Sequence, residues 1–396
     1  MSDLQYKCPG CGAPINFDPS SQGMTCEFCT QSFDVATVEK FNAGLHAQAG
    51  GSPSSMPPSP TGSGMPPAPV MSEGGPPQTA EQGADFQWKG APETFLDEKT
   101  QQMMAQFICN SCGGEIIGSP DLVSSRCPYC DNNFIAPTQL TSTRVPDRMI
   151  PFNVSKEQMT ASFQAASKGL LFLPGDFKNR HKIEDAKGVY LPYWLYDCNV
   201  AAQISYTGQQ SRTWREGNYE YTQTDYYQLM RGGYVGFDDI PVSGTKDVDE
   251  ERTEGIEPFD YRGTQPFATA YLAGYATNKY NIAPEVANER ANERVKVSTE
   301  EVFESTTGGY SNVQVQYSNI QLSKGIVEYV FLPTYLLNLS YGGKKYPFAI
   351  NGQTGKTVGE FPISKGKMYG FLAGLGVAAT ALLAYPVIFL VAVFMG

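Results

Sequence analysis

Eight of the nine cysteines in this 396-residue chain form two copies of one pattern, in which a CxxC pair is followed, fourteen residues later, by a second CxxC pair. The first copy consists of Cys8, Cys11, Cys26 and Cys29, and the second of Cys109, Cys112, Cys127 and Cys130. Four thiolates bind one tetrahedral Zn²⁺, which contributes about 10–16 kcal/mol of apparent binding energy to a segment too short to bury a core of its own. The pattern therefore predicts two zinc ribbons, each holding one structural Zn²⁺.

The two cysteine patterns belong to an internal repeat. They are offset by 101 residues, and the same offset aligns the apolar pairs Ile15 and Ile116, Phe28 and Tyr129, and Phe33 and Phe134. We expect these residues to form the small cores of the ribbons.

Two other uses of paired cysteines fit the sequence less well. A disulfide framework requires an oxidising compartment, and residues 1–5 lack the apolar core of a signal peptide. A thioredoxin-like redox pair lies at a helix start, whereas these CxxC pairs lie in Gly-rich turns. Because four protein ligands leave no open coordination position, the predicted sites are structural and not catalytic.

The C-terminal end has a different character. No charged residue occurs from Met368 to Gly396, and thirteen of these residues are strongly apolar, contributing on the order of −4 to −8 kcal/mol toward membrane insertion. As a helix the segment is about 40 Å long, enough for one passage through a bilayer. Lys365 and Lys367 precede it, so the positive-inside rule places the large N-terminal part in the cytoplasm. Gly370 and Gly374 form a GxxxG pattern that is compatible with a homo-oligomer.

The remaining sequence divides by composition. We expect the first ribbon in residues 1–45, a disordered Gly/Pro/Ser-rich linker in 46–92, the second ribbon in 93–140, a β-rich domain in 141–365 and a single transmembrane helix in 368–396. The proline pairs of the linker favour a spacer that tethers the ribbons loosely over a polyproline ligand for a partner. A short helix is predicted between Pro92 and Ile108.

Residues 141–365 contain the only segment large enough for a conventional core. Ser155 and Gln158 form a capping box at the start of a helix, and Pro284 begins a second helix that extends to about residue 304. Strands are predicted at Val189–Ser205, Tyr219–Leu229, Tyr329–Tyr341 and Lys345–Ile350, with tight hairpin turns at Gly342-Gly343 and Asn351-Gly352. The fold class is therefore α+β: two four-cysteine zinc ribbons, a β-rich antiparallel domain with inserted helices, and one C-terminal transmembrane helix.

Three sequence motifs in this region support a resemblance to a known family. They are Gly188 to Asp197 (GVYLPYWLYD), whose LPYWL is loosely repeated as LPTYL at Leu332 to Leu336, Tyr271 to Tyr275 (YLAGY), and Tyr346 to Gly359 around NGQTGK. With the order of ribbon, β-rich domain and terminal membrane helix, the chain resembles, over roughly residues 105 to 396, bacterial TFIIB-type zinc-ribbon membrane proteins that are often labelled as related to the primosomal helicase. The repeated LPxxL motif also suggests two related β halves.

The resemblance implies a recruiting function. Some members of that family are encoded beside phage-shock PspA-like and SPFH (flotillin-like) proteins and help to place them at the membrane. The expected function is thus a tail-anchored adaptor or scaffold in the bacterial cell membrane that assembles protein partners on the bilayer, in envelope stress or with SPFH or PspA-like proteins. The additional N-terminal ribbon and the linker are departures from the simpler members, and they leave the identity of the partner open.

The helicase label suggests an alternative, a membrane-associated nucleic-acid-binding protein. Residues 1–140 contain fourteen Asp and Glu against five Lys and Arg, and each zinc centre with four thiolates adds two negative charges. Binding to DNA requires several cationic side chains at phosphates. The charge balance therefore argues against a nucleic-acid partner.

The sequence predicts no catalytic or cofactor-binding residue, and hence no enzyme. The GQTGKT segment at Gly352 lacks the first glycine of a phosphate-binding loop, and its surroundings predict a hairpin instead. The two histidines, His46 and His181, lie in polar segments, and Cys198 is expected to be a buried thiol. The acidic run from Asp247 to Glu257 is expected to be a solvated loop.

Overall fold

The computed structural model describes residues 6–49, 87–91, 93–96, 105–109, 111–118, 127–130, 138–139, 144–178, 183 and 185–395. Side chains are not described at 46–49, 105, 138–139, 176, 178, 383 and 385–395. Residues 50–86, the greater part of the predicted linker, therefore lie outside the described residues.

The first ribbon is a small antiparallel sheet followed by a helix. Its elements are β1 (Asn16–Asp18), β2 (Gly23–Thr25), β3 (Ser32–Phe33) and α1 (Val35–Ala49). The carboxylate of Asp34 accepts hydrogen bonds from the backbone N–H and the hydroxyl of Thr37, both at 2.7 Å, and so satisfies donors that the first turn of α1 leaves free.

The second ribbon belongs to a larger sheet. Its strands β5 (Ala105–Ile108), β6 (Glu115–Gly118) and β7 (Thr138–Gln139) lie at one end of a 12-stranded sheet. The main path of that sheet links eight strands in the order β11 (Gln265–Pro266), β8 (Arg148–Met149), β13 (Ser311–Tyr341), β9 (Lys187–Glu216), β12 (Ala276–Asn278), β6, β5 and β7, and the other four strands pair off this path. The helix predicted between Pro92 and Ile108 is wrong at its end, because residues 105–108 pair with β6 and Phe107 is buried beside Ile116. Residues 97–104 of that prediction lie outside the described residues.

Two very long strands form the centre of the molecule. These are β9 (Lys187–Glu216) and β13 (Ser311–Tyr341), which are antiparallel and place Leu191 of the LPYWL motif opposite Leu332 of LPTYL. Each strand also pairs with its successor in the chain, β9 with β10 (Tyr219–Ser243) and β13 with β14 (Lys344–Asn351). The two motifs thus occupy equivalent places in two β hairpins, as expected of related halves.

Shorter elements complete the body. They are β4 (Lys89–Gly90), β8 (Arg148–Met149), β11 (Gln265–Pro266), β12 (Ala276–Asn278), β15 (Thr357–Gly359), α3 (Lys156–Ser167), α5 (Glu250–Gly255), α6 (Pro284–Glu304) and the 3₁₀ turns η1 (Gly175–Lys178), η2 (Tyr261–Gly263) and η3 (Thr269–Leu272). The capping box of Ser155 and Gln158 is present, and Pro284 lies in the first turn of α6, so both helix predictions are confirmed.

The two predicted hairpin turns have different outcomes. Gly342 (φ 59°) and Gly343 (φ 78°) make the expected two-residue turn between β13 and β14, since both positions need a left-handed backbone. At Asn351-Gly352 the connection is a longer loop, which ends where Asn351 N–H donates to the carbonyl of Lys356 at 2.8 Å. The loop is longer because the Asn351 side chain accepts hydrogen bonds from the N–H groups of Gln353 and Thr354 at 2.8 and 2.9 Å.

The acidic run is not a solvated loop throughout. Glu254 and Glu257 make ion pairs with Arg290 and Arg294 of α6, at 2.7 Å for Glu254 with Arg290 and 2.6 Å for Glu257 with Arg294. These ion pairs could not be predicted, because the arginines lie more than thirty residues farther along the chain.

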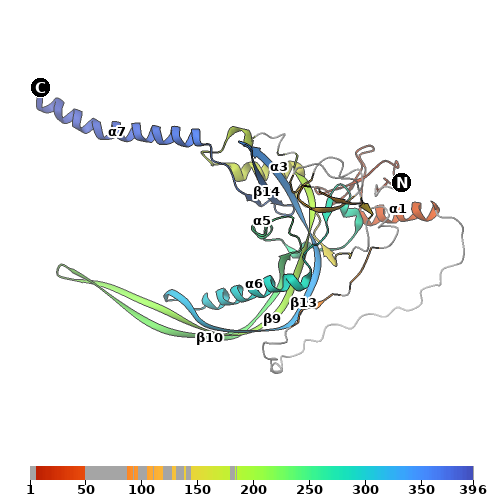
Figure 1. The fold of residues 1–396 in the computed structure, drawn as a ribbon, viewed down its shortest axis with the longest axis horizontal. Coiled ribbons are helices and arrows are strands. Elements are labelled where there is room, and N and C mark those ends of the chain that lie inside the picture. The colour runs from red at the N-terminus through yellow and green to blue at the C-terminus, as the bar shows by residue number, and fades with distance from the viewer. Residues whose placement is uncertain are drawn as a thin grey trace.

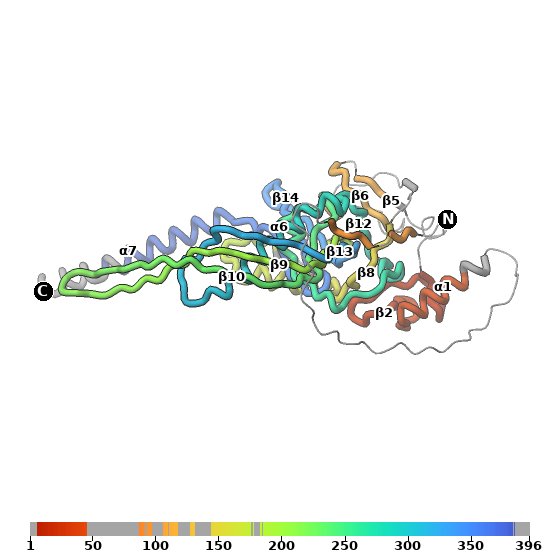
Figure 2. The backbone as a smooth tube through the Cα atoms, turned by 90° about the horizontal axis from the view of Figure 1, so that it is seen from below, coloured from red at the N-terminus to blue at the C-terminus, as the bar shows by residue number. Residues whose placement is uncertain are grey.

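The distal halves of β9 and β10 and the first part of β13 project from the body as a curved arm, which comprises residues 198–237 and 311–323. Helix α6 lies in the hollow of this curve (Figure 1). The C-terminal helix α7 (Lys365–Met395) projects from the same side of the body as the arm (Figures 1 and 2).

The predicted transmembrane segment, 368–396, is confirmed as a helix up to Met395. Within the described part of the chain, no helix combines the length and the apolar character needed to cross a membrane. Side chains from residue 385 onward lie outside that description.

Candidate metal centres

The first cysteine pair of each ribbon lies in a tight turn whose shape follows from its glycine. In the first ribbon the N–H of Cys8 donates to the backbone carbonyl of Ala13, and the N–H of Gly12 donates to the backbone carbonyl of Cys8, both at 2.8 Å. In the second ribbon the N–H of Cys109 donates to the backbone carbonyl of Gly114 at 3.0 Å, and the N–H of Gly113 donates to the backbone carbonyl of Cys109 at 2.8 Å. Gly12 and Gly113 have φ values of +74° and +75°, which favour glycine, and the turns present both thiols to one point.

The sulfur atoms of each group are arranged as a tetrahedral metal site requires. Closest Sγ–Sγ distances are 3.5 Å for Cys8–Cys29, 3.6 Å for Cys11–Cys26, 3.5 Å for Cys109–Cys130 and 3.7 Å for Cys112–Cys127. Sulfur atoms about 2.3 Å from a tetrahedral zinc ion are separated by about 3.8 Å. Within each group all four sulfurs lie within 4.8 Å of one another, and all are free thiols, so both predicted ligand sets are brought together at the right spacing.

Backbone N–H groups favour the thiolate form at two of these positions. Hydrogen bonds from the N–H of Cys29 and then of Phe28 lower the pKa of Cys26 to about 7. Burial raises the pKa of Cys109, but hydrogen bonds from the backbone of Cys112 and Ser111 outweigh it and bring that pKa to about 7. Metal ions bind the thiolate, so these two sulfurs are the best prepared to act as ligands, whereas the pKa values of the Cys29 and Cys112 thiols are raised, to about 12 and about 11.

The first ribbon is docked on the β-rich domain. Phe17 N–H donates to the carbonyl of Ala273 at 3.3 Å, its ring meets Tyr271 edge-on at 5.1 Å, and the side chain of Gln22 donates to the carbonyl of Phe152 at 2.8 Å. Ile15, Met24 and Val38 of the ribbon are buried in the same apolar cluster as residues of the central sheet. The first ribbon is therefore held by the β-rich domain, whereas the sequence led us to expect only a loose tether between the two ribbons.

The second ribbon is bound even more closely to the domain. Its strand β6 pairs with β12, and the hydroxyl of Thr277 donates to the carbonyl of Ile117 at 2.8 Å. From β13 and β14, Asn338 donates to the carbonyl of Pro128 at 2.8 Å and Lys345 donates to that of Cys130. Sequence reasoning missed these supporting residues, because they lie about 150 to 220 residues from the ribbon and carry no motif of their own.

The repeat positions that were expected in the ribbon cores differ in their surroundings. Tyr129 packs against the cluster that contains Phe107 and Ile116, whereas its counterpart Phe28 is 74% exposed. Phe33 is partly buried against the central core, and Phe134 lies outside the described residues. The prediction is therefore wrong for Phe28, because the second cysteine turn of ribbon 1 faces solvent while that of ribbon 2 faces the sheet.

The other chemical candidates do not assemble into a site among the described residues. Cys198 is buried, and burial raises the pKa of its thiol to about 12, so it is inert at neutral pH. The side chain of His46 and the whole of His181 lie outside the described residues. The GQTGKT segment joins the antiparallel strands β14 and β15, as a hairpin does, although by a longer loop than the predicted tight turn, and its Lys356 donates to the carbonyl of Glu257. A strand follows it, not the helix that a phosphate-binding loop requires.

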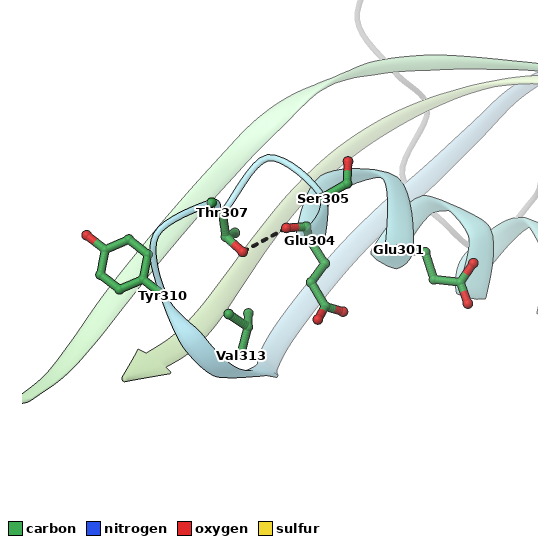
Figure 3. Close-up of a pocket in the computed structure, with 7 residues that line it drawn as sticks. Glu301, Glu304, Ser305, Thr307, Tyr310 and Val313 are labelled. Carbon is green, nitrogen blue, oxygen red and sulfur yellow. Dashed lines mark hydrogen bonds between the residues drawn. The ribbon is translucent and has the colours of Figure 1, made fainter. Parts of the chain in front are cut away.

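An open hollow of about 460 Å³ lies where α6 ends and β13 begins (Figure 3). Two of its three hydroxyl groups are engaged with the end of the helix: Thr307 donates to the carbonyl of Glu304 at 2.7 Å and Ser305 donates to that of Val302 at 2.6 Å. Glu301 and Glu304 make the hollow acidic. Its lining thus serves to terminate α6 and provides no activated nucleophile.

Comparison with known proteins gives one distant relative. The chain is 26% identical over 372 residues to a protein of Bacillus subtilis (strain 168) described as "Uncharacterized protein YdjG", and the alignment covers 94% of both chains. No protein-family model matches the chain, and no solved structure matches it.

Proposed function

We propose that this chain is a membrane-anchored adaptor that assembles protein partners at the cytoplasmic face of a bacterial membrane, and that each cysteine group holds one structural Zn²⁺. Zinc is favoured among metals because four thiolates in a closed tetrahedron are its usual structural ligand set. The observation that carries the anchor is helix α7, which leaves the body as a projecting rod and has no charged residue from Met368 onward.

The first turn of α7 is held by the loop that contains Phe172 and Leu173, and this loop has the composition expected of a segment at a membrane surface. Ser364 N–H donates to the carbonyl of Phe172 and Lys367 donates to that of Leu173, both at 2.7 Å, and the rings of Phe172 and Phe371 meet edge-on at 5.5 Å. The neighbouring Leu171 is 71% exposed. An exposed leucine beside lysines at the start of an apolar helix is suited to the boundary between headgroups and acyl chains.

The anchor is tested by placing charge on α7. We expect the wild-type chain to stay with the membrane pellet after alkaline carbonate extraction, and Leu375→Arg with Leu382→Arg to move it to the supernatant, because each arginine costs about 2.5–3.5 kcal/mol near the centre of a span. The matched control is Leu375→Ala with Leu382→Ala, which should stay in the pellet. A wild-type chain that is recovered in the supernatant would contradict the anchor.

Adaptor function is supported by the contrast between the two ribbons. Ribbon 2 uses its cysteine turn to bind the sheet, whereas ribbon 1 leaves Phe28 exposed on the equivalent turn. Ribbon 1 thereby offers a partner the kind of contact that ribbon 2 makes within the chain. By the family resemblance, the proposed partners are SPFH or PspA-like membrane-stress proteins.

Partner capture from solubilised membranes tests this part of the proposal. Purification through the wild-type chain should recover an SPFH or PspA-like protein, identified by mass spectrometry, and Phe28→Asp should reduce its yield at least tenfold. Tyr219→Asp, at the similarly exposed arm tip, is the control and should have no effect. Equal recovery with Phe28→Asp would exclude ribbon 1 as the contact, and a DNA gel shift at low salt would favour the nucleic-acid alternative instead.

A further inference from the structure

The arm has two faces of opposite character. Side chains alternate along its strands, and one set packs on α6: Tyr206 donates to the carbonyl of Glu300 at 2.9 Å, and Ser318 donates to the carboxylate of the same residue at 2.7 Å. Cys198, Val200 and Ile204 are buried on this inner face. Because α6 occupies the hollow of the curve in Figure 1, the alternate residues form the outer, convex face.

The part of the outer face nearer the body is uncharged, whereas Arg215 and Glu220 lie beyond it toward the arm tip. It is formed by residues 199, 201, 203, 205, 207 and 209 of β9, 226, 228, 230, 232, 234 and 236 of β10, and 317, 319, 321 and 323 of β13. These sixteen positions, all within the described strands, hold Tyr, Met, Gln, Asn, Ser, Thr, Ala and Gly and not one Asp, Glu, Lys or Arg. The face is therefore neutral in a chain whose formal net charge is −11.

Large side chains stand along both edges of this face. Met230 is 76% exposed and Tyr234 is 74% exposed on β10, and Tyr317 is 64% exposed on β13. Between them, the central strand β9 carries Ser205 opposite Met230 and Ala201 opposite Tyr234. At these two positions the side chains of β10 stand above those of the central strand, whereas Gln203 and Asn199 of β9 lie opposite Gly232 and Gly236.

We propose that the outer face of the arm binds the same face of a second copy of this chain. Two chains of charge −11 repel each other, and a neutral face allows contact without placing like charges opposite one another. Amide side chains both donate and accept hydrogen bonds, so a face rich in Gln and Asn is complementary to itself, as a two-fold interface requires. When two copies are offset sideways, Met230 and Tyr234 of one copy can lie over the small residues Ser205 and Ala201 of the other.

The area of the outer face limits the affinity expected of the dimer. At a rise of about 3.4 Å and a strand spacing of about 4.8 Å, sixteen residues on one face cover roughly 500 Å². Interfaces of less than about 600 Å² per partner are weak. The convex curvature places the contact at Met230 and Tyr234, so the dimer should be concentration-dependent, with a Kd on the order of micromolar.

Sedimentation of the full chain in mild detergent tests the dimer. The wild-type mass should rise from one chain to two between about 1 and 100 μM, and added salt should preserve or strengthen the dimer because it screens the repulsion between the rest of the two chains. Tyr234→Glu and, separately, Met230→Glu should each weaken association at least about tenfold, since each buries a carboxylate without a partner.

Tyr219→Glu is the matched control, because Tyr219 is 71% exposed but lies at the arm tip, outside the outer face. It should dimerise like the wild type. A wild-type chain that stays monomeric throughout, a dimer that is unchanged in both outer-face variants, as association through α7 would give, or equal dissociation by Tyr219→Glu would each overturn the proposal.

Discussion

Replacing Cys127 with serine should reduce the zinc content of the purified chain from two ions to one and destabilise the β-rich domain. With three thiolates, one coordination position of the zinc ion has no protein ligand, and most of the binding energy of about 10–16 kcal/mol that organises the second ribbon is then lost. Strand β6 of this ribbon pairs with β12, and Asn338 holds the carbonyl of Pro128 next to the metal ligand. Unfolding of the ribbon therefore removes one end of the sheet. Elemental analysis and thermal unfolding would measure both effects.

Cys26→Ser is the matched variant in the first ribbon, where Cys26 is buried like Cys127. It should also remove one zinc ion, but the thermal midpoint of the β-rich domain should fall less. Ribbon 1 forms its own three-stranded sheet and contacts the domain mainly through side chains, so its unfolding leaves the large sheet intact. Two zinc ions retained in Cys127→Ser, or a wild-type chain purified without zinc, would contradict the assignment of the ligands.

The features that could be predicted from the sequence are those determined by neighbouring residues. Cysteine spacing defined both ligand sets, the Ser155 capping box located α3, and Pro284 located the start of α6. Gly342-Gly343 gave the correct hairpin because a two-residue turn of that type demands a left-handed backbone at both positions. In each case the physical constraint acts over a few residues.

The docking of the ribbons could not be predicted in this way. Pairing of β6 with β12 joins residues about 160 positions apart, and a short strand such as Ala276–Asn278 has no signal beyond its β propensity. The prediction of a solvated loop for the acidic run was wrong for the same reason, since the arginines that pair with Glu254 and Glu257 lie on a distant helix. Burial of Tyr129 and exposure of Phe28 follow from docking, although the repeat made the two positions look equivalent.

The full length of the arm strands could not be predicted from the sequence either. The sequence predicted strands at Val189–Ser205 and Tyr219–Leu229, but β9 and β10 continue to Glu216 and Ser243. The additional residues of β9 are mostly polar, and those of β10 are interrupted by Gly232, Gly233 and Gly236, so apolar alternation does not reveal them. They are held by a long ladder of backbone hydrogen bonds between adjacent strands, which depends on register and not on side-chain character.

Truncation of Phe152 should have the largest effect of any substitution in the core. Its ring is fully buried, stacks on Tyr275 at 4.0 Å and meets Tyr190 and Tyr335 edge-on at 5.0 and 4.9 Å. It also packs on Gly352, where an added Cβ would lie 2.6 Å from the ring. Phe152→Ala should lower the free energy of unfolding by about 3–5 kcal/mol, measured by denaturant titration, because strands held in a ladder cannot move to fill the cavity.

Two variants show whether this loss comes from the cavity. Phe28→Ala makes the same chemical change at a side chain that is 74% exposed and should alter the free energy of unfolding by less than about 0.5 kcal/mol. Phe152→Leu refills most of the space and should cost less than about 1.5 kcal/mol. The main-chain carbonyl of residue 152, which Gln22 of the first ribbon contacts, is kept in both Phe152 variants, so they differ from the wild type only in the side chain. An alanine variant as stable as the leucine variant would mean that the aromatic cluster repacks around the vacancy.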